Sequence, residues 1–317
     1  MRKVEILIDS GHASWVLGGI FREIAQKNSK FFSHPKAMVP FGRLGFFKSV
    51  LIVLSLAFKR SVIIFSSVTP LQNFLRINPF NTNTKLLWFT HFEGALSKKT
   101  IKFLNKTQTI FVHSTHLMGE LQNLGVRTRI IPVVGAINPE LFHFIVSPGN
   151  KIAWIGTASS RKNPQLLLAF AQDNPDLKFQ VFGRNWRQHH IFENLKLLSN
   201  IEYRELDSKI TSSDLAECSH HLMLSAIEGG PISLLETLAA GLVPICTPVG
   251  IAPELLQEVG YEHQILEDEL TSFSIRKMFE TNYSQSHRKK VSDKIKYYSV
   301  SRLSSTIENA VLSLVKK

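Results

Sequence analysis

The chain has 317 residues, which is enough for two ordinary domains. Hydrophobic residues make up 44% of it and charged residues 20%, so it can bury substantial cores and lacks the composition of a disordered protein. Two cysteines, Cys218 and Cys246, have no metal-type spacing around them, which indicates a reducing compartment and a cytoplasmic protein.

The formal net charge of +12 is unevenly distributed along the chain. Residues 1–150 carry 18 Lys and Arg against 6 Asp and Glu, whereas residues 151–317 carry 19 of each. Two interpretations remain open for the first half: an ordinary basic surface, or a surface that faces an anionic membrane or an anionic acceptor. The cations show no arrangement with stacking aromatics, so we do not expect nucleic acid as a partner.

Short apolar runs alternate with helical patterns along the whole chain. In the first half the predicted strands are Val4–Asp9, Val62–Ser66, Lys85–Thr90, Thr109–His113 and Arg129–Val134. In the second half they are Lys151–Gly156, Lys178–Phe182, Ile201–Arg204, His220–Ser225, Val243–Thr247 and His263–Leu266. The run Val4–Asp9 near the start of the chain contains the charged residues Glu5 and Asp9, so it is typical of a strand and not of a signal peptide.

Helical patterns such as Pro164–Asp173 and Pro231–Ala240 separate most of the strands. This alternation predicts α/β architecture with two doubly wound domains, each built on a parallel sheet and facing a central cleft. We expect the domains to span residues 1–147 and 148–317, with "VSPGN" as the linker and the last helix packing back on the first domain. Ligands of such folds bind at the carboxyl ends of the strands.

The most apolar region spans residues 46–68. Three cations interrupt it, namely Lys48, Lys59 and Arg60, so it contains no stretch of about 18 uninterrupted apolar residues. We expect a helix that ends near Phe58 and is buried against a sheet. The alternative is an amphipathic element that begins after Arg43 and docks peripherally on the inner face of an anionic membrane.

The stretch "IEGGPISLLETLAAG" carries two glutamates, Glu228 and Glu236, directly after a predicted strand. Its glycines allow close approach of a ligand, and the amides of Gly229, Gly230 and Ile232 at a helix start can bind an anion. Carboxylates accept paired hydrogen bonds from vicinal diols, and a nucleotide sugar offers both a diphosphate and diols. The alternative is that both glutamates are ordinary solvated side chains.

The longer stretch "LSAIEGGPISLLETLAAGLVPICTPVGIAPELL" closely resembles the defining motif of glycosyltransferase family four, the retaining group 1 glycosyl transferases of GT-B fold. The motif consists of a serine, two glutamates around a glycine-rich turn, an Ala-Ala-Gly and a later Gly and Pro-Glu. All are present in order, as Ser225, Glu228, Glu236, Ala239, Ala240, Gly241, Gly250, Pro253 and Glu254.

A second block, residues 152–183, resembles the family's first strand and helix of the donor domain. There Gly156 ends the strand and Lys162 is the cation expected at the diphosphate. The family often has Arg directly after that glycine, where this chain has Thr157, and Arg161 is the candidate to supply the charge. The chain contains no Asp-x-Asp, and the acidic cluster at residues 267–269 reads as a solvated turn, so we expect no metal.

The first half resembles the family only in outline. Gly18 and Gly19 open a helix in "VLGGIFREIAQ", as the family's first loop does, and Gly19 is a candidate donor-site residue. His91 in "WFTHFEG" lies where many members carry a histidine near the donor sugar, although a hydrogen-bonded scaffold histidine is the alternative. The family's Pro-Asn-Gly-Val-Asp is altered here to a longer stretch from Pro132 to Asn138.

The resemblance implies transfer of a sugar from a nucleotide-diphosphate donor to an acceptor hydroxyl with retention of configuration, without a cofactor. It places Glu236 on the ribose. It makes Glu228 and His91 the catalytic residues, with Glu228 on the donor sugar's hydroxyls and His91 either orienting the sugar or stabilising the oxocarbenium-like state. The rest of the donor site would be Ser225, Arg161, Lys162, Gly229, Gly230 and Ile232, the last five against the diphosphate. The acceptor would be a glycan or a lipid-linked molecule, in glycan, lipopolysaccharide or glycolipid synthesis.

Two other functions remain open at this point. An epimerase or phosphorylase of the same architecture would turn over a sugar nucleotide without a foreign acceptor. A non-catalytic module would keep the donor site alone, a possibility supported only by Thr157 and the altered loop before Asn138.

Overall fold

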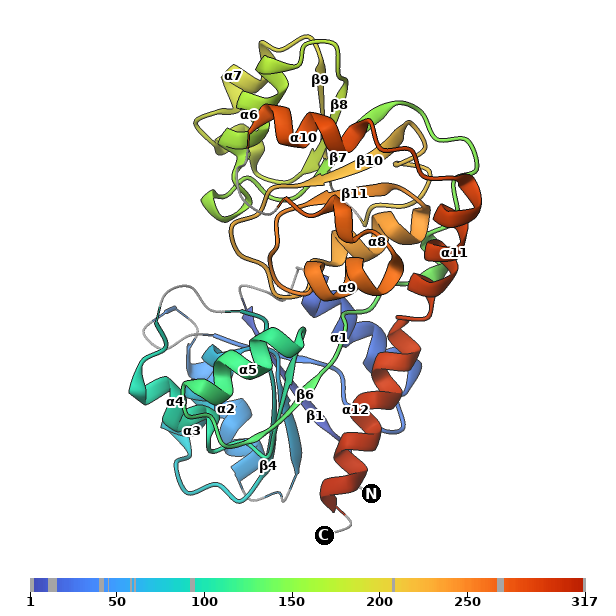
Figure 1. The fold of residues 1–317 in the computed structure, drawn as a ribbon. Coiled ribbons are helices and arrows are strands. Elements are labelled where there is room, and N and C mark those ends of the chain that lie inside the picture. The colour runs from blue at the N-terminus through green and yellow to red at the C-terminus, as the bar shows by residue number, and fades with distance from the viewer. Residues whose placement is uncertain are drawn as a thin grey trace. The chain divides into compact units, whose positions relative to one another are not determined.

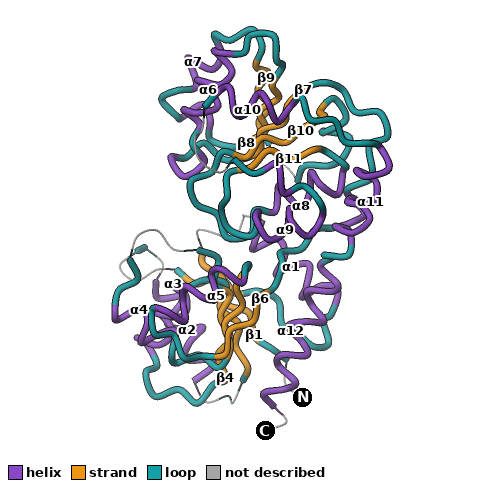
Figure 2. Tube along the Cα trace, viewed as in Figure 1, coloured by secondary structure: helices purple, strands orange, loops and turns teal. Residues whose placement is uncertain are grey.

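The computed structural model describes residues 3–10, 16–39, 43–44, 46–57, 59, 61–91, 95–206, 209–266 and 271–315. The chain divides into two compact units (Figure 1). The first comprises Met1–Ala136 and Val300–Lys317, and the second comprises Ile137–Ser299. Each unit contains one parallel sheet with helices on both of its faces (Figure 2), which confirms the predicted α/β class.

Six strands form the sheet of the first unit in the order β2-β1-β3-β4-β5-β6, and every neighbouring pair is parallel. They are β1 (Glu5–Asp9), β2 (Lys36–Met38), β3 (Val62–Phe65), β4 (Thr84–Trp88), β5 (Thr109–Val112) and β6 (Arg129–Pro132). The five strands predicted for this half are therefore present. β2 was not predicted, because three residues at a sheet edge are too few to show a strand period.

Four helices cover one face of this sheet: α2 (Phe46–Ala57), α3 (Val68–Ile77), α4 (Lys98–Leu104) and α5 (Thr115–Asn123). The other face carries α1 (Val16–Lys27) and α12 (Val300–Val315), which pack on each other. β3 shows why both faces need cover: Ile63 and Phe65 enter the core beneath α2, α3, α4 and α5, while buried Ile64 points the opposite way.

Five parallel strands form the sheet of the second unit, in the order β11-β10-β7-β8-β9. They are β7 (Lys151–Ile155), β8 (Phe179–Gly183), β9 (Ile201–Glu205), β10 (Cys218–Met223) and β11 (Val243–Cys246). The prediction of a strand at His263–Leu266 is wrong. The chain there makes a 3-10 turn, η5 (Glu262–Gln264), and Ile265 forms a single isolated bridge to Cys246, so that Leu266 is buried without a strand ladder.

The helices of the second unit also lie on both faces of its sheet. α6 (Pro164–Asp173), α7 (Phe192–Lys196) and α10 (Ser272–Phe279) enclose one apolar core. α8 (Ile232–Ala240), α9 (Ala252–Val259) and α11 (Gln285–Lys296) lie on the other side (Figure 1). α6 has the bounds predicted from the sequence, and α8 starts one residue later than predicted because Pro231 is its N-cap.

The division between the units falls after Ala136, ahead of the expected boundary at residue 147. The intervening segment is hydrogen-bonded into the second unit: the Ile145 amide donates to the Ala240 carbonyl at 2.9 Å, and the His143 amide donates to Ser212 Oγ at 2.6 Å. The expected linker therefore lies inside the second unit. At the other end, α12 belongs to the first unit.

Candidate active site

The candidate site lies at the carboxyl ends of three neighbouring strands of the second unit, β7, β10 and β11. A loop follows each strand: the 3-10 turn η3 (Ser160–Lys162) lies after β7, a glycine-rich turn lies between β10 and α8, and Thr247 begins the loop after β11. Parallel strands bring their carboxyl ends to one edge of a sheet, so residues far apart in the sequence converge there.

Three hydrogen bonds hold the β7 loop and the β10 loop together. The Ala226 amide donates to the Arg161 carbonyl at 2.8 Å, and the Arg161 guanidinium donates to the Ile227 carbonyl at 2.9 Å. Asn163 Nδ2 donates to the Leu224 carbonyl at 2.9 Å. Asn163 has φ of 50°, the left-handed conformation that asparagine tolerates better than most residues, and it ends η3 directly before α6.

The β11 loop fixes the glycine-rich turn from its other side. Thr247 Oγ1 donates to the Ser225 carbonyl at 2.6 Å, and the Ile251 amide donates to the Gly229 carbonyl at 2.9 Å. Gly250 has φ of +60°, and a Cβ added there would lie 2.3 Å from the Gly229 oxygen. A glycine is therefore required at position 250, both for its backbone conformation and for space.

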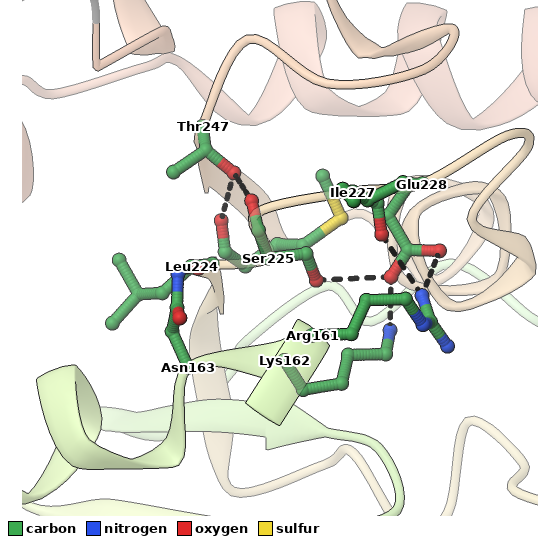
Figure 3. A network of polar contacts seen from close by, with 9 residues as sticks. Arg161, Lys162, Asn163, Leu224, Ser225, Ile227, Glu228 and Thr247 are labelled. Carbon is green, nitrogen blue, oxygen red and sulfur yellow. Dashed lines mark hydrogen bonds and ion pairs between the residues drawn. The ribbon is translucent and has the colours of Figure 1, made fainter. Parts of the chain in front are cut away.

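Glu228 is the centre of the polar network at this edge (Figure 3). Its Oε2 lies 2.9 Å from an Arg161 guanidinium nitrogen, and its Oε1 lies 2.5 Å from Lys162 Nζ. Ser225 Oγ donates a third bond to Oε1 at 2.9 Å. The Glu228 side chain is only 9% exposed, so these contacts are largely withheld from solvent.

The charges around Glu228 determine its protonation. Burial by itself would raise the pKa of its carboxyl, but the charges of Lys162 and Arg161 and the hydrogen bonds from Lys162 and Ser225 outweigh burial, so that the pKa lies below its ordinary value. The carboxylate is therefore ionised at neutral pH. Two cations facing one carboxylate leave one positive charge in excess, and the cluster can still attract an anion.

Glu236 has the opposite environment, although it lies only eight residues further along the chain. It is the fifth residue of α8 and is half-buried, and among the described residues it takes part in no hydrogen bond or ion pair. Burial raises the pKa of its carboxyl to about 8, while the charge of Lys209 acts against that shift. Glu236 therefore keeps its hydrogen-bonding capacity for a ligand.

The other predicted donor-site residues of the second unit lie next to this network. Gly229 is buried and bonded to the β11 loop, Gly230 follows it, and Ile232 begins α8. Pro231, the N-cap, has no N–H, so the first amide within the helix is that of Ile232. The helix N-terminus therefore starts at the glycine-rich turn that carries Glu228.

Two predicted residues belong to the first unit. Gly19 is the fourth residue of α1, within the first turn of that helix. His91 is half-buried and lies three residues beyond the last residue of β4, Trp88, on the carboxyl side of that strand. The members of the Glu228 network, in contrast, all belong to the second unit.

Several residues that support the site were not predicted. Asn163 and Thr247 fix the loops through the hydrogen bonds given above, and each is followed directly by a proline, a turn signal that could have marked both positions. His221 is fully buried and its Nδ1 lies 3.0 Å from Thr237 Oγ1, so it ties β10 to α8. Burial and the charge of Lys162 lower the pKa of His221 to about 3, so it is neutral.

Comparison with known proteins supports the sequence motif. Residues 142–269 match the protein family described as Glycosyl transferases group 1. That segment includes every candidate donor-site residue of the second unit, and it confirms the family resemblance for this part of the chain. No curated protein matches the chain significantly in sequence.

Solved structures show the fold of the whole chain. A sucrose-phosphate synthase from Thermosynechococcus elongatus is similar with a TM-score of 0.76 and 12% identity, over 99% of this chain and 100% of that one. The Anabaena protein Alr3699/HepE, solved with UDP-glucose, has a TM-score of 0.74 and 13% identity, over 98% and 100%. These similarities show that the fold is that of GT-B glycosyltransferases.

A pneumococcal O-GlcNAc transferase, GtfA, solved with UDP and GlcNAc, is also similar, with a TM-score of 0.62 and 12% identity. The match covers 84% of this chain but only 60% of that one, so the chain spans about three fifths of the length of that transferase. Within the residues that the structure describes, no group of three or more His, Cys, Asp or Glu side chains is placed to hold a metal ion.

Proposed function

We propose that this protein is a retaining glycosyltransferase that moves a sugar from a nucleotide-diphosphate donor to an acceptor hydroxyl. The observation that carries the proposal is the pairing of Glu228 with Arg161 and Lys162 at the strand ends, together with the carboxyl of Glu236 on the following helix, which has no partner among the described residues. This arrangement offers cations for a diphosphate and carboxylates for hydroxyl groups. The match of residues 142–269 to group 1 glycosyl transferases supports it.

The diphosphate of the donor would bind Arg161 and Lys162. In the structure Glu228 is the partner of both cations and holds them in place. A diphosphate brings two negative charges, so it can take over these cations and release the Glu228 carboxylate to accept hydrogen bonds from the donor sugar. The amides of Gly230 and Ile232, at the start of α8, add donors for the phosphate oxygens.

Glu236 would bind the ribose of the donor. A carboxylate accepts a bond from each hydroxyl of a vicinal diol, and Glu236 has both oxygens available for this purpose. Its raised pKa of about 8 means that an ionised Glu236 is favoured only once such donors are present or the pH is high.

In the transfer step, negative charge develops on the leaving diphosphate beside the two cations. The bond between the anomeric carbon and the phosphate oxygen breaks, and its electron pair stays on the diphosphate, where Arg161 and Lys162 stabilise the added charge. The acceptor oxygen bonds to the anomeric carbon on the same face, and the proton of the acceptor hydroxyl passes to the departing phosphate oxygen. We assign His91 to orienting the donor sugar.

Two finer parts of the proposal are metal independence and transfer of a hexose. Arg161 and Lys162 can balance the leaving diphosphate, which is the task that a divalent ion performs in many transferases. Among the similar structures, one contains UDP-glucose and another contains UDP and GlcNAc, which makes UDP-hexoses the first donors to test. The acceptor would be a glycan or lipid-linked molecule.

A thermal-shift panel of UDP, GDP and ADP sugars tests the donor site. A ligand present at a hundred times its dissociation constant stabilises the folded protein by about 2.7 kcal/mol, which raises the melting temperature by several degrees. The donor that binds is then incubated with and without candidate acceptors while release of the nucleoside diphosphate is measured.

We expect release of the nucleoside diphosphate to depend on the acceptor. Turnover of the sugar nucleotide without any acceptor would instead indicate an epimerase or a phosphorylase. Binding without turnover across all acceptors would indicate a non-catalytic module, and absence of any stabilising sugar nucleotide would contradict the proposal.

A further inference from the structure

Helix α2 in the first unit has two apolar faces, of which the sheet covers only one. Val53 and Leu56 on the inner face are fully buried in the core beneath α2, α3, α4 and α5. Ser49, also buried, closes this face by hydrogen bonding to the backbone of Val39 directly after β2. This inner face alone supplies the apolar residues that a surface helix needs in order to pack against a sheet.

The outer face of α2 is apolar as well. Phe47 is 70% exposed, Leu51 is 53% exposed and Leu54 is 51% exposed, and Leu44, just before the helix, is fully exposed. Steps of four and then three residues place the three helical side chains one above the other along a single line. We call these four residues the α2 stripe. Single exposed leucines are common on soluble proteins, but a continuous apolar row of this kind indicates a partner.

Cations surround the α2 stripe. Arg43 lies directly before Leu44, Lys48 lies on the exposed side of the helix, and Lys59 follows its end, and all three are exposed. The same face of the first unit also carries Arg76 on α3 and Lys98, Lys99 and Lys102 on α4, again exposed. α2 packs on α3, and α3 packs on α4.

The sequence gives this region its charge. Between residues 24 and 119 there are thirteen Lys and Arg residues and one acidic residue, Glu93. The difference is +12, which equals the formal net charge of the entire chain. All of the excess charge of the protein is therefore concentrated in the part of the first unit that contains α2, α3 and α4.

We propose that the α2 stripe and its cations dock this protein on an anionic lipid bilayer. An interfacial helix buries an apolar row at the level of the acyl chains while flanking Lys and Arg contact anionic headgroups. A second copy of the chain is a poor occupant, because it would bring a surface of the same sign. None of the described helices is long and apolar enough to cross a membrane, so the contact is at the surface.

The test is co-sedimentation with vesicles of phosphatidylcholine alone and of phosphatidylcholine mixed with phosphatidylglycerol, at low and high salt. The stripe variant combines Phe47→Ser, Leu51→Ser and Leu54→Ser, and the charge variant combines Arg43→Glu, Lys48→Glu and Lys59→Glu. The control, Leu197→Ser with Phe273→Ser, removes two equally exposed apolar residues from the second unit. Circular dichroism and the donor thermal shift verify that each variant is folded.

We expect the wild type and the control to bind the anionic vesicles at low salt and to be released at high salt, because surface attraction is screened within a Debye length. The charge variant should lose affinity by roughly fivefold or more for each cation. The stripe variant should bind at least about tenfold more weakly even at low salt, because the apolar contact is gone.

Three results would overturn the proposal. One is the absence of wild-type binding to anionic vesicles at low salt. Another is a stripe variant that binds them as well as the wild type does. The third is a wild-type dimer in light scattering that the stripe variant converts to a monomer, which would make a second copy the occupant of the α2 stripe. None of these results depends on whether the protein transfers a sugar.

Discussion

The turn after β10 and helix α8 carry two glutamates of one motif in opposite electrostatic states. Glu228, on the turn, is enclosed by Arg161, Lys162 and Ser225, and the pKa of its carboxyl is held below the ordinary value. Glu236, on the helix, has no such partners in the part of the chain that the structure describes, and burial raises the pKa of its carboxyl to about 8. Spacing along the sequence therefore does not define what a carboxylate does, whereas its neighbours in space do.

Removing a cation from Glu228 should have the largest effect on the proposed transfer. Lys162→Ala takes away one of two charges that stabilise the leaving diphosphate, and we expect the turnover rate to fall by about 10²–10³. The measurement is steady-state release of the nucleoside diphosphate. Lys151→Ala is the matched control, since Lys151 is likewise an ion-paired lysine, with Glu202 and Glu217 as its partners, but begins β7 at its opposite end. Equal losses in both variants would contradict the assignment of Lys162.

The two glutamates should respond differently to removal. Glu236→Ala should weaken donor binding by about 1.5–3 kcal/mol, because a charged hydrogen bond to the ribose is lost. Glu228→Ala should mainly lower turnover, because it removes contacts with the sugar while leaving the cations for the diphosphate. Isothermal titration gives the first quantity and kinetics gives the second. If neither binding nor turnover changes in either variant, the assignment of the carboxylates to hydroxyl groups is wrong.

The raised pKa of Glu236 should make donor binding depend on pH. With a pKa of about 8, the Glu236 carboxyl of the protein without donor is mostly protonated at pH 7. The donor binds the carboxylate form, so the carboxyl must release a proton on binding, and the affinity for the donor is roughly tenfold weaker at pH 7 than at pH 9. The folded state holds this proton more tightly than the unfolded chain. The stability that the protonated Glu236 carboxyl gives to the folded state is therefore complete below the ordinary carboxyl pKa and is lost as the pH rises through about 8.

Titration of a UDP-sugar at several pH values measures this dependence, because its diphosphate does not titrate in that range. Glu236→Gln is the control, and its affinity should be the same across the series. A wild-type affinity that does not change between pH 7 and pH 9 would show that Glu236 does not bind the donor as a carboxylate.

A chelator should have the smallest effect. If Arg161 and Lys162 balance the diphosphate, transfer in the presence of EDTA should equal transfer without it. A strict requirement for Mn²⁺ or Mg²⁺, demonstrated by loss of activity in EDTA and its recovery on adding the ion, would mean that a further group carries the charge.

The sequence predicts the second unit better than the first. The strands before residue 250 and helix α6 are predicted by the periodic spacing of apolar residues, and the glycine-rich turn between β10 and α8 is predicted by its glycine content. The contacts of Glu228 do not follow, because Arg161 and Lys162 are more than sixty residues away and meet it only through the pairing of β7 with β10. Short structures are also missed, such as β2, whose three residues depend on the neighbouring strand.

Helix α2 shows a further limit. Its apolar composition predicts a buried helix, and the inner face with Val53 and Leu56 is buried as expected. Composition does not show that Phe47 and Leu51 point outward, since the direction of a side chain follows from where the helix packs. Phe58 and Arg60, which the sequence assigns to the same segment, lie outside the described residues, as do the acidic residues 267–269.

The pairing of Glu228 with its two cations also bears on which anions can bind at Arg161 and Lys162. Inorganic phosphate or sulfate could take Arg161 and Lys162, but it would leave the largely buried Glu228 carboxylate with the Ser225 hydroxyl and without either cation, and that loss offsets much of the attraction. A molecule that carries charge and hydroxyl groups at a fixed distance from each other replaces both sets of contacts at once. We therefore expect inorganic phosphate and sulfate to bind this cluster more weakly than a ligand that replaces both sets of contacts.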